Sequence, residues 1–311
     1  MNGILVIDKP QGLTSHDVVN RARRILGERS VGHLGTLDPS ATGVLPLVIG
    51  SFTRLAQFYA HAEKIYEGLI RFGFATDTYD ADGEATSTPQ SVILKRDEME
   101  ALAAQFRGTI EQMPPPFSAK KVGGVPAYKL ARKQREVTLK PVLVEIKEFA
   151  LLEVAGDRLT FRAHVGSGTY LRAIAHDMGQ KLGCGAHLAA LRRTAVAEFR
   201  IEDACRLEDL ELATREGAQA MEAMFVHPRK IAPQLPGVTA TEENVALIRT
   251  GRAVNLPEMS RAPLVKVFYG QRELVAIATR IAGTLFHAGI VLTATARPTS
   301  TRQAVGSERN A

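Results

Sequence analysis

Residues 32–45 read GHLGTLDPSATGVL and hold a single carboxylate, Asp38, in an otherwise uncharged stretch. Asp-Pro commonly begins a turn, so a plain turn is the simplest interpretation. Two features favour a functional role for Asp38. The backbone is open to close approach by another molecule at three glycines, Gly32, Gly35 and Gly43. Apolar residues follow in ATGVLPLVIG, so the carboxylate borders a core, where it is either paired or functional.

Length and composition indicate a soluble globular protein. The chain has 311 residues, enough for one large and one small domain, with 45% hydrophobic and 23% charged residues. No apolar run is long enough to span a membrane and no secretory pattern begins the chain, so we expect a cytoplasmic protein without a membrane partner. Two isolated cysteines and eight scattered histidines predict neither a disulfide nor a metal site. A net charge of +6 suits a polyanionic partner without requiring one.

Strand and helix patterns interleave over the first 230 or so residues without a regular βα repeat, which favours an α+β fold. Strands are expected at 4–7, 66–74, 142–154 and 159–165. Helices are expected at 14–27, 97–106 and 170–182. The first helix has its own end signals, since Thr14 and Asp17 have the spacing of a capping-box variant and Gly27 supplies a stop.

The composition changes around Pro233–Pro236, where we place a linker. A helix is expected from Thr239 to Gly251, with Thr239 and Glu242 as its capping box. LVKVF and LVAIA, joined by YGQRE, predict a β-hairpin, and one further strand is expected at 290–292. The last residues have too little apolar surface to fold. We therefore expect domains at 1–232 and 233–294 and a disordered tail at 295–311.

Five blocks carry a resemblance to a known family. GHLGTLDPSATGVLPLVIG closely resembles the signature of the bacterial tRNA pseudouridine-55 synthases, the TruB family. The other blocks, in the family's order, are GILVIDKPQGLTSHDVV, KIYEGLIRFGFATDTYDADGE, FRGTIEQMPPPFSAKKVGGVPAYKLAR and GSGTYLRAIAHDMGQKLGCGAHLAALRR. The resemblance implies a pseudouridine synthase catalytic fold with a mixed, largely antiparallel central sheet. It also implies an insertion or thumb lobe at about 113–142 and a small, β-rich, PUA-like RNA-binding domain at the C-terminus.

The implied reaction isomerises the T-loop uridine at position 55 of tRNA to pseudouridine, without a cofactor. The enzyme flips the uridine out, and the carboxylate of Asp38 is the catalytic group. A carboxylate is able to attack as a nucleophile and then leave. Attack at ribose C1′, attack at uracil C6 and a route in which Asp38 acts as a base all remain open from the sequence.

The resemblance assigns roles to further residues that, taken alone, would pass for surface or core positions. Arg172 pairs with Asp38 and keeps it ionised and aimed. Tyr66 lies against the target base, where its hydroxyl is placed to relay a proton. These two complete the catalytic set with Asp38. Four residues are assigned to substrate binding: His33, Tyr170, Leu191 and Lys9.

The expected partner is the T-arm stem-loop of tRNA, bound by a monomer without a guide RNA. A basic run at 120–147 supplies charge for RNA, and Arg192 and Arg193 are expected to contact phosphates. Two alternatives stay open: a non-catalytic RNA-binding or RNA-folding protein, and a guide-dependent synthase subunit. The insertion at 113–142 favours the stand-alone enzyme. Leu34 departs from the family, which often has threonine there.

Overall fold

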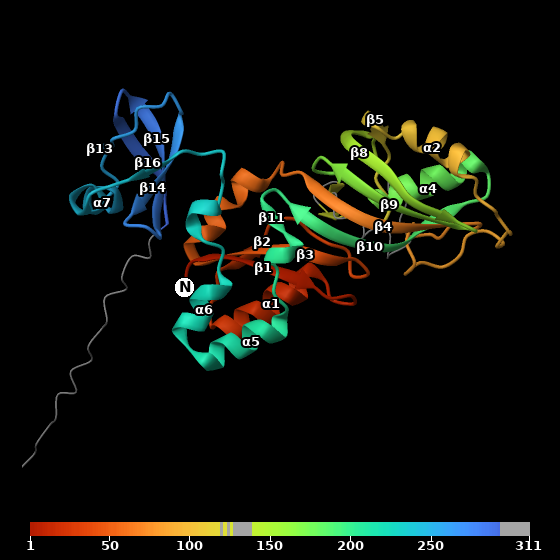
Figure 1. The fold of residues 1–311 in the computed structure, drawn as a ribbon, viewed down its shortest axis with the longest axis horizontal. Helices are drawn as coiled ribbons and strands as arrows, with labels where there is room; N and C mark the ends of the chain where they lie inside the picture. The colour runs from red at the N-terminus through yellow and green to blue at the C-terminus, as the bar shows by residue number, and fades with distance from the viewer. Residues whose placement is uncertain (119–120, 123–124, 127–138, 293–311) are drawn as a thin grey trace, which may run out of the picture. The chain divides into compact units, whose positions relative to one another are not determined.

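The computed structural model describes residues 1–118, 121–122, 125–126 and 139–292 (Figure 1). The chain forms two compact units, one comprising Gly3–Pro236 and the other beginning at Gly237. Most of the lobe expected at 113–142 and the whole tail expected at 295–311 lie outside the described residues. Of the lobe, the structure describes two short strands, β6 (Lys121–Val122) and β7 (Val125–Pro126), which pair with each other.

The first unit is built on one mixed sheet in the order β1-β3-β10-β4-β9-β8-β5, with β2 beside β3 and β11 beside β10. Its strands are β1 (Gly3–Lys9), β2 (Val31–His33), β3 (Thr42–Ile49), β4 (Lys64–Phe72), β5 (Gly108–Gln112), β8 (Val142–Ala155), β9 (Arg158–Val165), β10 (Ala186–Val196) and β11 (Phe199–Arg200). All pairs are antiparallel except β10 with β3, which is parallel. The predicted α+β class with a mixed, largely antiparallel sheet is confirmed.

Three helices pack on the β1–β3 end of the sheet: α1 (Ser15–Leu26), α5 (Leu207–Glu216) and α6 (Ala218–Met224). Their apolar side chains share one buried cluster with those of β1 and β3, including Val18, Leu45 and Leu210. The predicted capping box of α1 is confirmed, because the Thr14 side chain accepts from Asp17 N and the Asp17 carboxylate accepts from Thr14 N. Gly27 ends the helix in the left-handed conformation, as expected.

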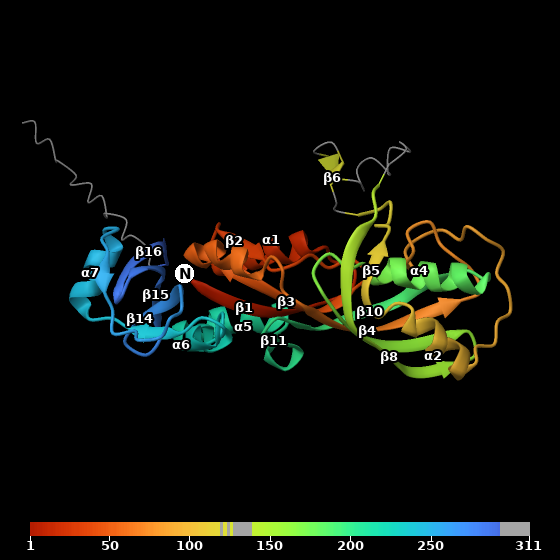
Figure 2. The same cartoon turned by 90° about the horizontal axis from the view of Figure 1, so that it is seen from above.

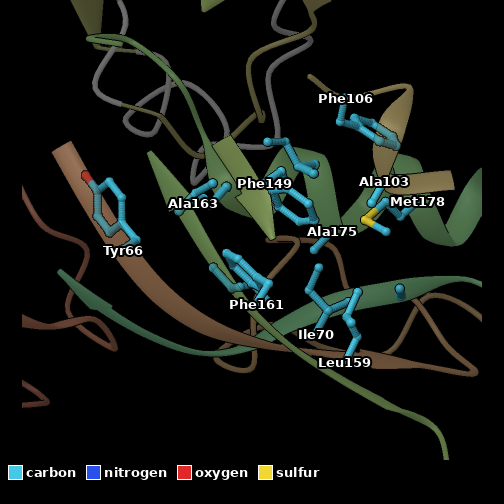
Figure 3. Close-up of a cluster of buried hydrophobic side chains, with 14 of the residues drawn as sticks. Tyr66, Ile70, Ala103, Phe106, Phe149, Leu159, Phe161, Ala163, Ala175 and Met178 are labelled. Carbon is cyan, nitrogen blue, oxygen red and sulfur yellow. The ribbon is translucent and has the colours of Figure 1, made fainter. Parts of the chain in front are cut away.

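The other end of the sheet, where Figure 2 shows α2 (Arg96–Ala104) and α4 (Leu171–Leu182), holds a second cluster that includes side chains of both helices. Phe149 of β8 and Phe161 of β9 stack there, with ring centroids 4.9 Å apart. Figure 3 shows Tyr66 at the edge of this cluster rather than in its middle. Tyr66 is only 8% exposed, so most of its ring packs against apolar neighbours. The edge position brings Tyr66 to a surface that a ligand can reach.

Short 3₁₀ helices complete the first unit: η1 (Gly50–Tyr59), η2 (Ile201–Asp203) and η3 (Pro228–Lys230). Tyr59, at the end of η1, donates to Glu198 Oε1 over 2.5 Å. Ala232 N donates to the same carboxylate oxygen over 2.9 Å and to the Tyr59 hydroxyl over 3.0 Å. These bonds fix the segment just before the second unit to the sheet of the first.

The second unit is a five-stranded sheet in the order β12-β14-β15-β16-β13 with one helix. Its elements are β12 (Gly237–Thr239), α7 (Glu242–Arg249), β13 (Val254–Asn255), β14 (Leu264–Tyr269), β15 (Glu273–Ala282) and β16 (Leu285–Val291). The predicted hairpin is present as β14–β15. The predicted cap of the helix is wrong: Thr239 pairs with Phe268 in the sheet, and Thr241 caps α7 by accepting from Asn244 N.

Candidate active site

Asp38 lies in the loop 34–41, which connects β2 and β3 of the large sheet. Its neighbours Leu37 and Ala41 are buried in the apolar cluster under α4, whereas 40% of the Asp38 side chain is exposed. Ser15, at the start of α1, holds the Leu37 backbone from both sides: its hydroxyl accepts from Leu37 N over 2.8 Å and donates to Leu37 O over 3.1 Å. The carboxylate is therefore presented to solvent by a firmly anchored loop.

Two buried cations also hold this loop through its carbonyl groups. The guanidinium of Arg193, fully buried, donates to Gly35 O, Thr36 O and Val44 O over 2.9, 3.3 and 2.8 Å. The ammonium of Lys9, also fully buried, donates to Pro10 O, Leu13 O and Pro39 O over 2.9, 2.6 and 3.2 Å. Burial lowers the pKa of Lys9 to about 8, while the Asp38 charge opposes that shift. Two buried cations thus anchor the segments around Asp38, and one of them, Lys9, interacts electrostatically with its carboxylate.

Arg172 makes the direct contact with Asp38. Its Nη2 donates to Asp38 Oδ1 over 3.3 Å, and its Nε lies 3.0 Å from Asp38 Oδ2, although the direction of that N–H is poor for a hydrogen bond. The Arg172 side chain is 6% exposed and the Asp38 side chain 40% exposed, so the guanidinium is fixed and the carboxylate faces outward. Such a pair orients the carboxylate toward whatever enters from solvent.

The position of Arg172 is set by its own helix and by two other segments of the chain. It is the second residue of α4. Gln112, at the end of β5 and only 1% exposed, fixes the residue before this helix: its side chain accepts from Tyr170 N and donates to Tyr170 O, over 2.8 and 3.0 Å. The Nη1 of Arg172 donates to Thr78 O over 3.3 Å. Sequence reasoning did not single out Gln112, although it lies in one of the quoted blocks, because the glutamine is near Tyr170 only in the folded chain.

A pocket of about 310 Å³ opens beside this ion pair, within the size range of small-ligand sites. It is lined by residues 35–38, Ala60, Lys64, Tyr66, residues 166–172, Leu188 and Leu191. Five of the predicted site residues therefore share one cavity: Asp38, Tyr66, Tyr170, Arg172 and Leu191. The Tyr170 ring centroid lies 5.7 Å from the Arg172 guanidinium carbon, and burial raises the pKa of Tyr170. Tyrosine and leucine side chains around one ion pair suit a planar, polar ligand such as a nucleobase.

Asp80 is a further acidic residue at the site that sequence reasoning did not single out. It is 8% exposed and lines a small second cavity together with Asp38 and Leu188. The Thr78 hydroxyl donates to Asp80 Oδ1 over 2.5 Å. Burial raises the pKa of Asp80, while its hydrogen bond with Thr78 and the charge of Arg172 oppose the shift. The run DTYDADGE was the available signal, since it lies in one of the quoted blocks.

Four of the predicted residues, three basic side chains and one histidine, lie outside the lining of this pocket. Lys9 points into the protein and supports the loop instead of reaching the pocket. His33 ends β2, outside the pocket lining, and burial lowers its pKa. The phosphate role expected for Arg193 is contradicted by its burial. Arg192 is half-exposed but binds Asp8 through two bonds of 2.8 and 3.1 Å.

Within residues 1–118 and 139–292, no group of three or more His, Cys, Asp or Glu side chains is placed to hold a metal ion. The described helices include none that is both long and apolar enough to cross a membrane.

Comparison with known proteins identifies the class. Residues 23–171 match the family described as TruB family pseudouridylate synthase, N-terminal domain, and residues 172–228 match the tRNA pseudouridylate synthase B C-terminal domain. The chain belongs to the TruB family of pseudouridylate synthases, enzymes that isomerise uridine in RNA to pseudouridine.

Two relatives carry the same printed name, tRNA pseudouridine synthase B. The protein of Solibacter usitatus is 48% identical over 295 residues, which cover 94% of this chain and 100% of the relative. The protein of Bacillus thuringiensis is 38% identical over 284 residues, covering 89% of this chain and 92% of the relative. The similarity therefore extends over both units and not over the catalytic blocks alone.

Solved structures share the fold at lower identity. One, described as an H/ACA RNP bound to a substrate RNA containing 2′-deoxyuridine, has a TM-score of 0.69 and 25% identity, over 94% of this chain and 85% of that chain. A Cbf5-Nop10-Gar1 complex has a TM-score of 0.66 and 27% identity, over 91% of this chain and 79% of that chain.

Proposed function

We propose that this chain is a stand-alone tRNA pseudouridine synthase that isomerises the T-loop uridine at position 55. The observation that carries the proposal is the outward-facing Asp38 carboxylate, fixed by a nearly buried Arg172 at the mouth of a pocket with aromatic walls. The name and coverage of the relatives support tRNA as the substrate. The enzyme would act as a monomer in the cytoplasm, where unmodified tRNA is found.

The chemistry requires the N1–C1′ glycosidic bond to break and a C5–C1′ bond to form. The proton on C5 leaves and N1 gains one, so the reaction needs no oxidant, reductant or cofactor. Asp38 supplies the carboxylate that reacts with the flipped nucleotide, and Arg172 stabilises the charge on it. Tyr66 and Leu191, which line the pocket, would enclose the base, and the Tyr66 hydroxyl would move a proton. His33 and Lys9 would act from outside the pocket, by shaping the loop that carries Asp38.

Two observations favour this proposal over the alternatives. The catalytic pair of Asp38 and Arg172 is present, which a non-catalytic RNA-binding protein would not need. The similar solved structures are an H/ACA RNP and a Cbf5-Nop10-Gar1 complex, but identity is 25–27% there and 38–48% to relatives named as tRNA enzymes. The second comparison supports independence from a guide RNA.

The test is to incubate the purified protein with an unmodified tRNA transcript and no guide RNA, and to map pseudouridine by chemical labelling. Asp38→Asn and a transcript with cytidine at position 55 are run in parallel. We expect one modified position, at 55, with the wild-type protein only. Tight binding without product would refute the stand-alone enzyme, and product from Asp38→Asn would refute the role of the carboxylate.

A further inference from the structure

Lys64 lines the same pocket and has no part in the chemistry proposed above. It begins β4, two residues before Tyr66, so both side chains point to the same face of the strand, about 7 Å apart along it. Its ammonium donates to Ala62 O over 2.7 Å. No carboxylate pairs with it among the residues that the structure describes. The charge of Lys64 is therefore available to a ligand.

The charged side chains that line the pocket carry an excess of one positive charge. The charged residues in its lining are Asp38, Arg172 and Lys64, and the first two pair with each other. The neighbouring carboxylate, Glu63, is occupied elsewhere, with Lys147 and His164 at 2.5 and 2.7 Å. Burial, together with the charge of Arg193, lowers the pKa of Lys64 to about 8. A bound anion would offset both effects.

The space around Lys64 suits an RNA backbone. Lys64 pairs with Val165 at the end of β9, and the loop 166–169 continues from there as part of the pocket wall. Gly168 in this loop has a φ of +86°, and no atom lies within 4 Å of the place where its Cβ would be. Gly35, on the other side, passes close to the lysine, since a Cβ there would lie 3.2 Å from Lys64 Cε. Gly168 therefore leaves the wall of the pocket that Lys64 lines open to close approach by the backbone of another molecule.

We propose that Lys64 binds a phosphodiester of the substrate RNA next to the flipped uridine, and that this contact seats the base against Tyr66. This inference rests on the proposed function, because it needs an RNA substrate in this pocket. Lys64 contacts the substrate backbone and takes no part in bond making or breaking. Its loss should weaken binding more than it slows the chemical step.

The first measurement is the salt dependence of the affinity for tRNA, in an Asp38→Asn background that prevents turnover. Lys64→Gln should lower the slope of log Kd against log salt by about 0.7–0.9, the contribution of one phosphate contact. It should weaken binding about tenfold at 0.15 M salt. Lys64→Arg should keep the slope. The matched control is Lys181→Gln, which removes one charge at the far end of α4, where Lys181 Nζ binds Gln105.

The second measurement locates the phosphate. T-arm stem-loops are made with a neutral methylphosphonate at each single position flanking the target uridine and assayed with wild type and Lys64→Gln. At one position the two losses should not add, because both remove the same contact. Additive losses at every position, or an unchanged salt slope, would overturn the proposal while the wild type still forms pseudouridine. A wild type that forms none would instead refute the proposed function.

Discussion

Arg193→Lys tests whether the buried guanidinium, and not only its charge, holds the loop that carries Asp38. Arg193 makes three hydrogen bonds to carbonyl groups, two of them at Gly35 and Thr36, just before Asp38. A lysine ammonium lacks the fork and keeps about one of these bonds. Each bond from a charged donor contributes about 1.5 kcal/mol at the low end, so the substitution should reduce the free energy of unfolding by about 3 kcal/mol.

That loss is smaller than the usual stability of a domain, so the variant should still fold. For a unit of this size it corresponds to a fall in Tm of about 6–12 °C. The single-turnover rate should fall about 100-fold, since a shift of about 1 Å in a catalytic group has that effect. Both quantities are measured by urea or thermal unfolding and by single-turnover assays on a tRNA transcript.

The neighbouring Arg192→Lys is the matched control, because it makes the same change on the same strand. Arg192 and its partner Asp8 have side chains 42% and 27% exposed, so their ion pair contributes about 1 kcal/mol or less. If Arg193→Lys lowers stability and rate no more than Arg192→Lys does, the buried guanidinium does not hold the loop and the reasoning is refuted.

Three further predictions concern the surroundings of the same loop. Gly43→Ala should destabilise the protein by about 3 kcal/mol in urea unfolding, because Gly43 has a φ of +101° and its new Cβ would lie 2.2 Å from Arg193 O. The control Gly32→Ala should lose little stability, because its Cβ meets only a Val48 methyl at 3.4 Å, and similar losses for both variants would contradict the account. Tyr79→Ala should slow single-turnover catalysis about tenfold, whereas Tyr79→Phe should not. The Tyr79 ring stacks on His176 with centroids 3.8 Å apart and so fixes Thr78, whose carbonyl accepts from Arg172. Equal rates for both variants would show that the ring stack does not position Arg172. Between pH 8 and 9.5 the free energy of unfolding should rise less steeply with pH in Lys64→Gln than in the wild type. The reason is that the folded protein releases the Lys64 proton near pH 8, while the unfolded chain keeps it until about pH 10.4. Parallel pH profiles would show that the pKa of Lys64 is not lowered in the folded protein.

Local signals in the sequence were sufficient where one segment decides its own structure. The capping box of α1 depends on Thr14 and Asp17, three residues apart, and it forms as predicted. The cap of α7 shows the limit. Thr239 and Thr241 are both suitable caps, and the sheet decides between them, because Thr239 pairs with Phe268 of β14. A contact that is distant in sequence thus decided a local feature.

The candidate site was predicted through family resemblance and not through spacing, because its members are distant in the chain. Asp38 and Arg172 are 134 residues apart, and no periodicity connects them. Asp80 and Gln112 were missed for the same reason: they come near Asp38 and Tyr170 only after the sheet has formed. Resemblance named the residues that it matched, and the fold added those that position them.

Arg193 and Lys64 explain why basic residues in an RNA enzyme cannot be sorted by sequence alone. Both are cations near one loop, yet Arg193 is fully buried with three carbonyl acceptors, whereas Lys64 lines the pocket with one. A buried cation surrounded by acceptors already makes its hydrogen bonds within the protein and stabilises the fold. A half-buried cation with a single acceptor retains donors for an anion. The number of acceptors around each cation therefore separates residues that hold Asp38 in place from the residue that we expect to hold the RNA.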